Sequence, residues 1–402
     1  MDFRFTKEEE AFRQEVRSFI KKELPPDYVY EFMMVGLEED KMAFTRSMAK
    51  KLAEKGWLTM AWPKEFGGEN RPHMQQVVYW EECSYYGVPG IDMGVGGITW
   101  IGPSLMLFGS DDQKKEHLPP IAKGDRFWCT GFSEPGAGSD LSSLQCRAKR
   151  DGDHYVVNGQ KIWTSGAHVA DWIWLAVRTN PDAPKKNQGI SVLMMDMKTP
   201  GVTVRKLIEQ TGTEGLNEVF FDDVRVPVEN VVGGENAGWM IVTAGLAFER
   251  GHPGIMTATS IKRLLDDMVS FTRETKVDGK PLSSDPFVRM KLADMAIGVE
   301  LAQLLAYRVV EVAFQPGVPM GEVARLTSTS KIFNAELFQR SMDSAVQIMG
   351  LAGQLTKDGK WAHLQGRIAR GYLFSPAYTL LSGTSEILRT VIGTMGLGLP
   401  RG

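Results

Sequence analysis

The chain has 402 residues, of which 43% are hydrophobic and 24% are charged, a composition typical of globular proteins, and its length suggests two or three domains. Lysine and arginine total 46 against 49 for aspartate and glutamate, so the formal net charge is −3. This balance, without a basic run, argues against a nucleic-acid-binding surface, and the sequence has no apolar stretch of about 20 residues to predict membrane insertion.

The first part of the chain, residues 1–126, predicts an all-helical domain. Residues 7–22 place Phe12, Val16 and Phe19 on one face, with Thr6 as the N-cap. Residues 42–55 and 111–123 continue the helical pattern, and a glycine follows each segment.

The middle part, residues 127–236, predicts a β-domain. Asp151-Gly152 and Asn158-Gly159 are typical of hairpin turns, because both dipeptides tolerate positive φ. Short runs of β-branched and aromatic residues predict strands at 154–157, 172–178, 190–197, 202–207 and 219–224. This spacing predicts a small sandwich or barrel.

The last part, residues 237–402, predicts a helical domain resembling a four-helix bundle. Asp285-Pro286 marks a helix start, and 320–349 is a second long helix. One apolar stripe follows the helix start: Val288, Leu292, Met295, Val299 and Ala302. The predicted fold class is therefore α+β, with two helical domains flanking a β-domain.

Cysteine and histidine are sparse. Three cysteines far apart in sequence do not predict a disulfide framework, and the six histidines show no metal-ligand spacing, so we expect no metal. The first 16 residues carry Glu8, Glu9 and Glu10 instead of an apolar signal core. A reducing, cytoplasmic location is expected.

Three segments carry residues suited to a flat or phosphorylated ligand. Residues 131–140 (GFSEPGAGSD) form a glycine-rich loop, 158–166 (NGQKIWTSG) present a tryptophan beside two hydroxyls, and 383–389 (GTSEILR) start a helix. Each also has a purely structural interpretation: a connector with Asp140 as a helix cap, a core tryptophan, and an ordinary helix start.

Together these segments resemble the acyl-CoA dehydrogenase family, flavoproteins that use FAD. Further similarity comes from Gly56-Trp57, from 224–227 (VRVP) and from 347–350 (QIMG), so the resemblance covers nearly the whole chain. It implies α,β-desaturation of an acyl-CoA thioester: a carboxylate removes the α-proton and the β-hydrogen leaves as hydride. It also implies an electron-transferring flavoprotein as the acceptor.

The resemblance implies where the cofactor binds. Ser133 is expected near the flavin ring, Ser139 near the pyrophosphate or CoA, Trp163 over the flavin and Ser165 beside N5. The full expected cofactor set is Thr130, Phe132, Ser133, Gly138, Ser139, Trp163, Thr164, Ser165, Arg273, Gln347, Gly350, Thr384 and Glu386. Gln347 and Gly350 are expected to act from a neighbouring subunit, which implies a homotetramer or homodimer.

The position of the catalytic base departs from the commoner family pattern. Many relatives have a glutamate directly before Gly-Thr-Ser, where this chain has Ser382. A serine hydroxyl is too weak a base without an activating partner, although the Ser382 N–H could polarise the thioester. A minority of the family carries the base before an arginine on an earlier helix, which matches Glu249-Arg250 here. We expect Glu249 to be the base and Arg250 to contact CoA; the structural alternative is a surface Glu–Arg pair.

Two further departures bear on the substrate and the assembly. Residues 251–254 (GHPG) predict a kink beside the base and hence a wide acyl pocket, with His252 lining it or satisfying backbone groups. The family's Arg-x-x-Phe-Gly is reduced to Arg273 without the phenylalanine, which leaves the contact with the adenine half of FAD undetermined and allows a hetero-oligomer.

The sequence thus predicts an FAD-dependent dehydrogenase for a bulky, branched, cyclic or dicarboxylic acyl-CoA. Two alternatives remain at this point. One is a non-catalytic partner subunit that completes a neighbour's FAD site. The other is a flavin monooxygenase or desulfinase on the same fold, which needs no α-proton base.

Overall fold

The computed structural model describes residues 4–32, 37–249, 253–313, 315, 317–356 and 359–400. The chain forms two compact units, each assembled from segments far apart in sequence. We call Met1–Met33, His73–Val88 and Arg250–Gly402 the helical unit, and Met34–Pro72 and Pro89–Glu249 the sheet unit. Helical parts accompany a central sheet, so the predicted α+β class is confirmed.

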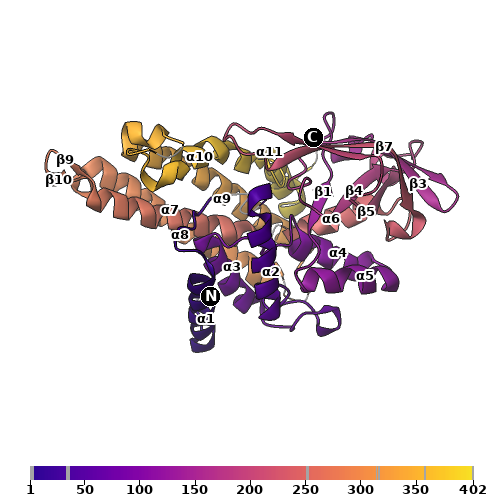
Figure 1. Cartoon of the computed structure of the whole chain (residues 1–402), viewed down its shortest axis with the longest axis horizontal. Helices are drawn as coiled ribbons and strands as arrows, with labels where there is room; N and C mark the ends of the chain where they lie inside the picture. Colours follow the sequence, from indigo (N-terminus) through magenta and orange to yellow (C-terminus); the bar gives the residue numbers. More distant parts are fainter. Residues whose placement is uncertain are drawn as a thin grey trace. The chain divides into compact units, whose positions relative to one another are not determined.

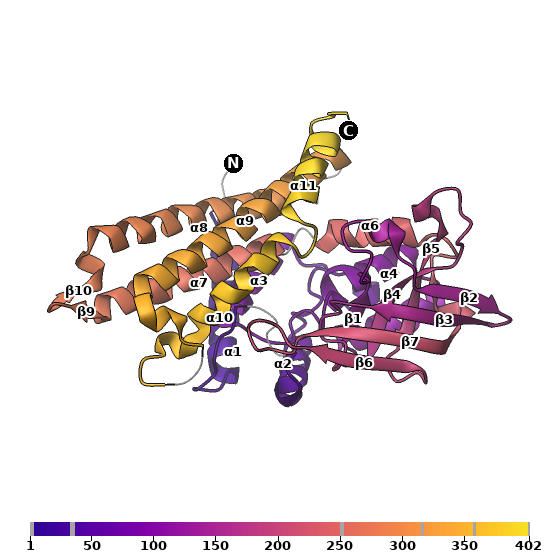
Figure 2. The same cartoon turned by 90° about the horizontal axis from the view of Figure 1, so that it is seen from above.

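Helices dominate the helical unit. They are α1 (Lys7–Glu23), α3 (His73–Tyr86), α7 (Pro253–Glu274), α8 (Pro286–Ala313), α9 (Met320–Met349), α10 (Arg367–Phe374) and α11 (Ser385–Val391). A short hairpin of β9 (Lys276–Val277) and β10 (Lys280–Pro281) joins α7 to α8. In both Figure 1 and Figure 2, α7, α8 and α9 run side by side and the hairpin lies at one end of α7 and α8.

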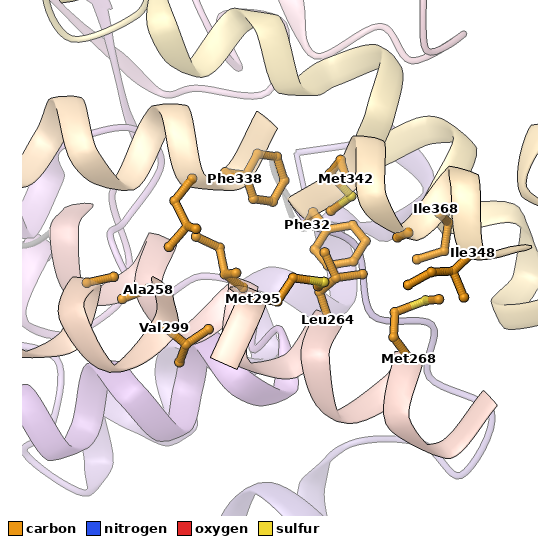
Figure 3. Close-up of a cluster of buried hydrophobic side chains, with 14 of the residues drawn as sticks. Phe32, Ala258, Leu264, Met268, Met295, Val299, Phe338, Met342, Ile348 and Ile368 are labelled. Carbon is orange, nitrogen blue, oxygen red and sulfur yellow. The ribbon is translucent and has the colours of Figure 1, made fainter. Parts of the chain in front are cut away.

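Apolar side chains fill the space between these helices (Figure 3). Leu264 and Met268 come from α7, Met295 from α8, and Phe338 and Met342 from α9, and each is at most 3% exposed. The flexible methionines adapt to irregular gaps between helices. Burial of each such side chain stabilises the unit by about 1.5–3 kcal/mol.

The predicted helix starts are confirmed in this unit. The Thr6 hydroxyl accepts a hydrogen bond from the Glu9 N–H at 3.2 Å, and the Glu9 carboxylate accepts one from the Thr6 N–H at 2.7 Å. At α8, the Asp285 carboxylate accepts hydrogen bonds from the N–H groups of Phe287 (2.7 Å) and Val288 (3.3 Å). These caps satisfy N–H groups that have no partner inside the helix.

The sheet unit has one main sheet among its described residues. Its strands are β1 (Trp128–Gly131), β2 (Arg147–Asp151), β3 (His154–Lys161), β4 (Trp172–Arg178), β5 (Ile190–Asp196), β6 (Val202–Leu207), β7 (Leu216–Pro227) and β8 (Val231–Val232). The order is β6-β7-β3-β2-β4-β5-β8, with β1 also paired to β4. The accompanying helices are α2 (Met42–Glu54), α4 (Gly102–Phe108), α5 (Asp111–Ala122) and α6 (Gly238–Glu249).

A break along one edge of β4 positions the glycine-rich loop. β1 runs parallel to β4 and ends with Gly131 opposite Leu175, whereas β2 meets the same strand only at Arg147 opposite Arg178. β5 occupies the other edge of β4 along its whole length. The chain between Gly131 and Arg147 therefore leaves the sheet and returns to it further along β4.

One of the two predicted hairpin turns is confirmed and the other is wrong. Asp151 pairs with His154, so Gly152, with φ 63°, lies in a tight turn between β2 and β3. Asn158-Gly159 instead lies inside β3, where the register against β7 shifts between Val157 and Gly159. Gly159 has φ 145°, and a Cβ there would approach the Cys146 Cα at 2.8 Å. The dipeptide thus marks a β-bulge at a close backbone approach.

His117 on α5 is enclosed by aromatic rings and is 1% exposed. Its ring centroid lies 5.5 Å from that of Trp128 and 4.6 Å from that of Trp172. The Arg126 guanidinium lies 2.7 Å from His117 Nδ1 and donates to it, because arginine has only donors. Burial, reinforced by the Arg126 charge, lowers the pKa of His117 to about 3.

Acidification below pH 6.5 is therefore expected to destabilise the sheet unit. The unfolded chain protonates this histidine near pH 6.5, but the folded chain does so only near pH 3, so the stabilisation present above 6.5 is lost as the pH falls. The loss reaches about 2 kcal/mol by pH 5. In urea unfolding at pH 7 and pH 5, His117→Gln should lose less stability on acidification than the wild type and than His154→Gln; an unchanged loss in His117→Gln would contradict this role.

The three cysteines are free and buried: Cys83, Cys129 and Cys146. Burial raises the pKa of each thiol, which keeps it protonated and unreactive. The described part of the chain contains no group of three or more His, Cys, Asp or Glu side chains placed to hold a metal ion. Among the described helices, none is both long and apolar enough to cross a bilayer.

Candidate functional site

The glycine-rich loop between β1 and β2 is fixed at its base by a buried ion pair. Lys161, at the end of β3, is fully buried; its Nζ lies 2.7 Å from Glu134 Oε1 and donates to the Phe132 carbonyl at 3.0 Å. The Glu134 carboxylate also accepts from the N–H groups of Gln145 (2.5 Å) and Cys146 (2.9 Å). Each buried charge therefore has an opposite charge and further hydrogen bonds, the condition under which a buried ion pair persists.

A second cation fixes the far end of the loop. The Arg178 guanidinium donates to the carbonyls of Ser142 (2.6 Å) and Leu144 (3.2 Å). Asp140 precedes a short 3-10 turn, and its carboxylate accepts from the hydroxyls of Ser142 and Ser143 rather than from a backbone N–H. The expectation that Asp140 caps a helix is therefore wrong: its carboxylate binds two side-chain hydroxyls instead.

The middle of the loop is exposed. Glu134 and Ala137 exchange backbone hydrogen bonds of 2.9 and 3.0 Å, so a tight turn forms between them. Gly138 and Ser139 follow on the surface, and a Cβ added at Gly136 or Gly138 would meet no atom within 4 Å. Packing within the described structure therefore does not require glycine at these two positions. The close approach of a ligand to the backbone would require it.

The second segment lies directly beside this loop. The Ile162 N–H donates to the Ser133 carbonyl at 2.9 Å, so the two predicted cofactor segments meet within the sheet unit. The next residue, Trp163, has φ 61° and is 58% exposed. Both features are unusual for tryptophan, because positive φ is strained for a bulky residue and an exposed indole loses the benefit of burial. An aromatic ring held outward in this way is suited to cover a flat ligand.

Thr164 carries a buried hydroxyl for which the described structure supplies no hydrogen-bond partner. Its backbone is held on both sides by Asn217: the Thr164 N–H donates to the Asn217 carbonyl at 3.0 Å, and Asn217 Nδ2 donates to the Thr164 carbonyl at 2.9 Å. The neighbouring Ser165 is half-buried. A rigidly held, unsatisfied hydroxyl beside an exposed indole indicates a polar ligand atom at this position.

Phe132 is supported by a buried acidic turn. Its ring meets the Trp100 ring edge-on, with centroids 5.3 Å apart. Trp100 belongs to a short π-helix, Gly97–Ile101, whose N–H groups at Ile98 and Thr99 donate to the Asp92 carboxylate at 3.2 and 3.0 Å. Burial raises the pKa of Asp92 to about 7, against the opposing effect of these hydrogen bonds. Thr130, also expected at the cofactor, lies in β1 opposite Trp174.

In the helical unit, the third segment is held by a buried lysine. Lys331 on α9 donates to the carbonyls of Tyr378 (2.8 Å) and Gly383 (2.7 Å). Ser382 has φ 56° and Gly383 has φ 93°, so two consecutive residues adopt the left-handed region. For serine this conformation costs about 1 kcal/mol, and such strain is concentrated at functional sites.

This strained turn leads into α11. The Thr384 hydroxyl accepts a hydrogen bond from the Ile387 N–H at 3.2 Å, so Thr384 is the N-cap of α11. The ordinary helix start that the sequence offered as an alternative is therefore present. Glu386 is exposed in the first turn. Ser385, in contrast, has a buried hydroxyl without a partner in the described structure.

The remaining expected cofactor residues lie elsewhere in the helical unit. Gln347 and Gly350 are exposed at the C-terminal end of α9, and Arg273 is exposed in the last turn of α7. Along α9, Gln347 is 16 residues beyond Lys331, a helical rise of about 24 Å. Gln347 and Gly350 are therefore remote from Thr384 within one protomer.

The expected base and its neighbours lie at the edge of the described part of the structure. Glu249 is the last residue of α6, and its side chain lies outside the described part of the structure. Arg250 and His252 lie outside the described residues altogether. α6 is described as far as Glu249 and α7 from Pro253, and the predicted kink at 251–254 falls partly on residues outside the described part of the chain and stays a prediction.

Family models for three acyl-CoA dehydrogenase domains match this chain: the N-terminal domain over residues 6–125, the middle domain over 129–224 and the C-terminal domain over 236–397. Acyl-CoA dehydrogenase FadE26 of Mycobacterium tuberculosis is 35% identical, over 100% of this chain and 99% of the relative. The chain belongs to the acyl-CoA dehydrogenase family.

Solved structures agree with this assignment. The complex named "Tcur3481-Tcur3483 steroid ACAD" is similar with a TM-score of 0.89 and 33% identity, over the full length of both chains. The ChsE4-ChsE5 complex from Mycobacterium tuberculosis is similar with a TM-score of 0.86 and 34% identity, again over the full length of both. This acyl-CoA dehydrogenase is thus an oxidoreductase and a flavoprotein with FAD as its cofactor.

The residues described above fit FAD. The exposed indole of Trp163, the unsatisfied hydroxyl of Thr164 and the open face at Gly136 and Gly138 are the features that a flat, polar, phosphorylated group would complete. When bound, FAD accepts the hydride that leaves the substrate. The individual cofactor contacts expected from the sequence remain predictions.

Lys161, Glu134 and Asn217 were missed as functional determinants. Lys161 and Glu134 lie inside the recognised motifs, but the sequence does not show that both side chains are buried. A signal existed for Lys161, because it occupies an inward-facing position of β3, where a lysine is expected only if an acidic partner is buried with it.

Proposed function

We propose that this acyl-CoA dehydrogenase introduces an α,β-double bond into a bulky, ring-bearing acyl-CoA, with Glu249 as the base. The observation that carries the proposal is the residue before Gly383: it is Ser382, which cannot act as the base, so the carboxylate must come from elsewhere. Glu249 stands at the end of α6, the position at which a minority of the family carries its base.

In this mechanism the chain's own residues perform three tasks. The Glu249 carboxylate takes the α-proton. The Ser382 N–H, presented by a left-handed turn, donates to the thioester carbonyl and so stabilises the charge that develops as the proton leaves. Trp163 and the 131–140 loop hold the reacting groups together and exclude water.

The substrate class rests on similarity and on the kink that the sequence predicts at residues 251–254. Among the similar structures, the one named "Tcur3481-Tcur3483 steroid ACAD" matches this chain over its full length. The glycines and proline of residues 251–254 are expected from the sequence to loosen the helix beside the proposed base, which would leave room for a wide acyl group. We propose in addition that an electron-transferring flavoprotein reoxidises the enzyme and that the reaction takes place in the cytoplasm.

The full-length similarity to dehydrogenases does not favour the monooxygenase or desulfinase alternative. The assembly is a separate question. We propose an oligomer in which Gln347 and Gly350 reach a neighbour's cofactor, because both are exposed and remote from Thr384 in their own protomer. The neighbour is a second copy or a homologous partner, as in the ChsE4-ChsE5 complex.

An acyl-CoA panel tests the substrate proposal. Linear, branched, ring-bearing and dicarboxylic acyl-CoAs are mixed anaerobically with the enzyme, and the loss of visible flavin absorbance is followed. Ring-bearing substrates should give a kcat/KM at least about tenfold above linear chains of equal carbon number, because a wide pocket leaves a linear chain poorly packed. A preference for linear chains would refute the substrate class, while flavin loss with none of them would refute dehydrogenation.

A further inference from the structure

The turn that precedes α4 is organised around one acidic side chain, Asp92. Besides the N–H groups of Ile98 and Thr99, its carboxylate accepts hydrogen bonds from the Gly96 N–H at 2.8 Å and from the Thr99 hydroxyl at 3.1 Å. Burial nevertheless raises the pKa of Asp92 to about 7, so the charged form is held here at a cost in free energy. A charge kept where burial disfavours it is more readily explained by function than by stability.

The backbone next to Asp92 is strained and is joined to β1. Met93 is fully buried, yet it has φ 53°, which is unfavourable for a residue with a long side chain. The Met93 carbonyl accepts from the Trp128 N–H at 2.9 Å, and the Val95 N–H donates to the Trp128 carbonyl at 2.8 Å. The turn is therefore fixed to the start of β1, the strand that leads into the glycine-rich loop.

The indole of Trp100, in the π-helix that Asp92 anchors, is enclosed on three sides and is 5% exposed. A Cβ at Gly96 would lie 1.2 Å from Trp100 Nε1, and a Cβ at Gly245 on α6 would lie 3.2 Å from Trp100 Cε3, so the ring packs directly on both backbones. The Phe132 ring occupies the third side, at the root of the glycine-rich loop. Because a close-packed interior leaves no free space, a shift of the indole displaces the loop, α6 or both.

The α6 contact connects this turn with the expected base. Gly245 precedes Glu249 by four residues, so the two positions lie on the same face of α6. α4, which follows the π-helix directly, lies beside α6 in Figures 1 and 2. The Asp92 turn thus contacts both the segment expected to touch the flavin and the helix expected to carry the base.

We propose that Asp92 is a positioning residue of the active site, which acts through Trp100 on the glycine-rich loop and on α6. The carboxylate fixes the first N–H groups of the π-helix, the π-helix fixes the indole, and the indole holds Phe132 and α6 at a set separation. Short π-helical turns are frequent at functional sites, which agrees with this role. The inference rests on the proposed placement of FAD at the glycine-rich loop, and it adds a determinant outside the recognised motifs.

The test compares Asp92→Asn with wild type and with Asp112→Asn, which neutralises an exposed carboxylate of the same unit. Asparagine keeps the size of the side chain but replaces one acceptor oxygen with an amide donor, so the turn loses part of its anchor. At pH 8, the FAD-loaded proteins are mixed anaerobically with the acyl-CoA that reduces the flavin fastest in the panel above. The limiting rate of flavin reduction should fall about 10- to 100-fold in Asp92→Asn, with the half-saturating acyl-CoA concentration changed less than about threefold, because misplacement slows reaction more than binding. Asp112→Asn should match wild type.

The visible absorption spectrum of bound FAD supplies a readout that needs no turnover. A displaced Phe132 should alter the surroundings of the flavin and shift the visible maximum in Asp92→Asn but not in Asp112→Asn. A wild-type spectrum in Asp92→Asn would overturn the proposal whatever the reduction rate. Because the spectrum does not depend on the base, an active Glu249→Gln enzyme would contradict the proposed function without affecting this test.

A second variant, Trp100→Phe, covers the case in which Asp92→Asn does not fold, because it leaves the carboxylate and its hydrogen bonds in place. Phenylalanine lacks the outer ring of the indole, which packs on Gly245, so flavin reduction should slow by about threefold or more and the visible maximum should shift. If Asp92 acts through Trp100, the double variant should reduce its flavin within about twofold of the rate of Asp92→Asn alone. Multiplied effects in the double variant, or a wild-type rate and spectrum in Trp100→Phe, would overturn the proposal.

Discussion

Replacing Glu249 with glutamine is expected to slow flavin reduction by an acyl-CoA about 10²- to 10⁴-fold, the contribution of a general base. Glutamine keeps the size and the hydrogen-bonding capacity of the side chain but cannot take the α-proton. FAD content and acyl-CoA binding should be preserved, because the proposed role is proton transfer alone. Anaerobic stopped-flow absorbance measures the reduction rate, and equilibrium titration measures ligand binding.

Two control variants make this result specific. Glu229→Gln neutralises an exposed carboxylate of the same unit and should leave the rate unchanged. Ser382→Ala removes the hydroxyl while keeping the backbone N–H, so its effect should be within a few-fold if Ser382 acts through its backbone. Near-normal flavin reduction in Glu249→Gln, or a collapse in Ser382→Ala, would move the base away from Glu249.

Replacing Lys161 with methionine is expected to destabilise the sheet unit by about 3–5 kcal/mol, because it leaves the Glu134 carboxylate buried without its cation. The change also removes the donor to the Phe132 carbonyl, 3.0 Å from Lys161 Nζ. Since this loop carries the expected FAD contacts, FAD should be lost at lower denaturant concentration than in wild type. Urea unfolding, followed by tryptophan fluorescence and by flavin release, measures both effects.

The matched control is Lys149→Met, which removes an exposed lysine from the adjacent strand β2. It should alter stability by less than about 0.5 kcal/mol. Combining Lys161→Met with Glu134→Gln should cost less than the sum of the two single changes, by about 1–3 kcal/mol, because the two side chains are in contact. Equal effects at positions 149 and 161, or strict additivity of the double variant, would show that the pair does not fix the loop.

Local patterns predicted several elements well. The strand over Trp172–Arg178 and the helix over Met320–Met349 have the predicted bounds, and Thr6 and Asp285 cap helices as expected. These features depend on side-chain periodicity and on hydrogen bonds to backbone within three residues. Where the pattern misled, tertiary contacts prevailed: the Asn158-Gly159 turn signal became a bulge, because β3 continues in its pairing with β7.

The predicted site was only partly accessible to such reasoning. Motif similarity identified the loop around Ser133 and the segment around Trp163, and the structure confirms that they are adjacent. Motif similarity did not distinguish the residues that hold the loop in place from the residues that face outward. Glu134 is turned inward to Lys161, while Gly138 and Ser139 remain on the surface.

From its residues alone this chain specified its family and its helical and β segments, because those depend on residue identity and short-range spacing. Tertiary structure alone decided the pairing of Glu134 with Lys161 and of β1 with β4. Lys161 lies 27 residues from Glu134 along the chain, and the parallel pairing of β1 with β4 joins residues 44 positions apart. Such contacts form only when burial brings distant segments together, and the cost of an unpaired buried charge or backbone group then selects the partner.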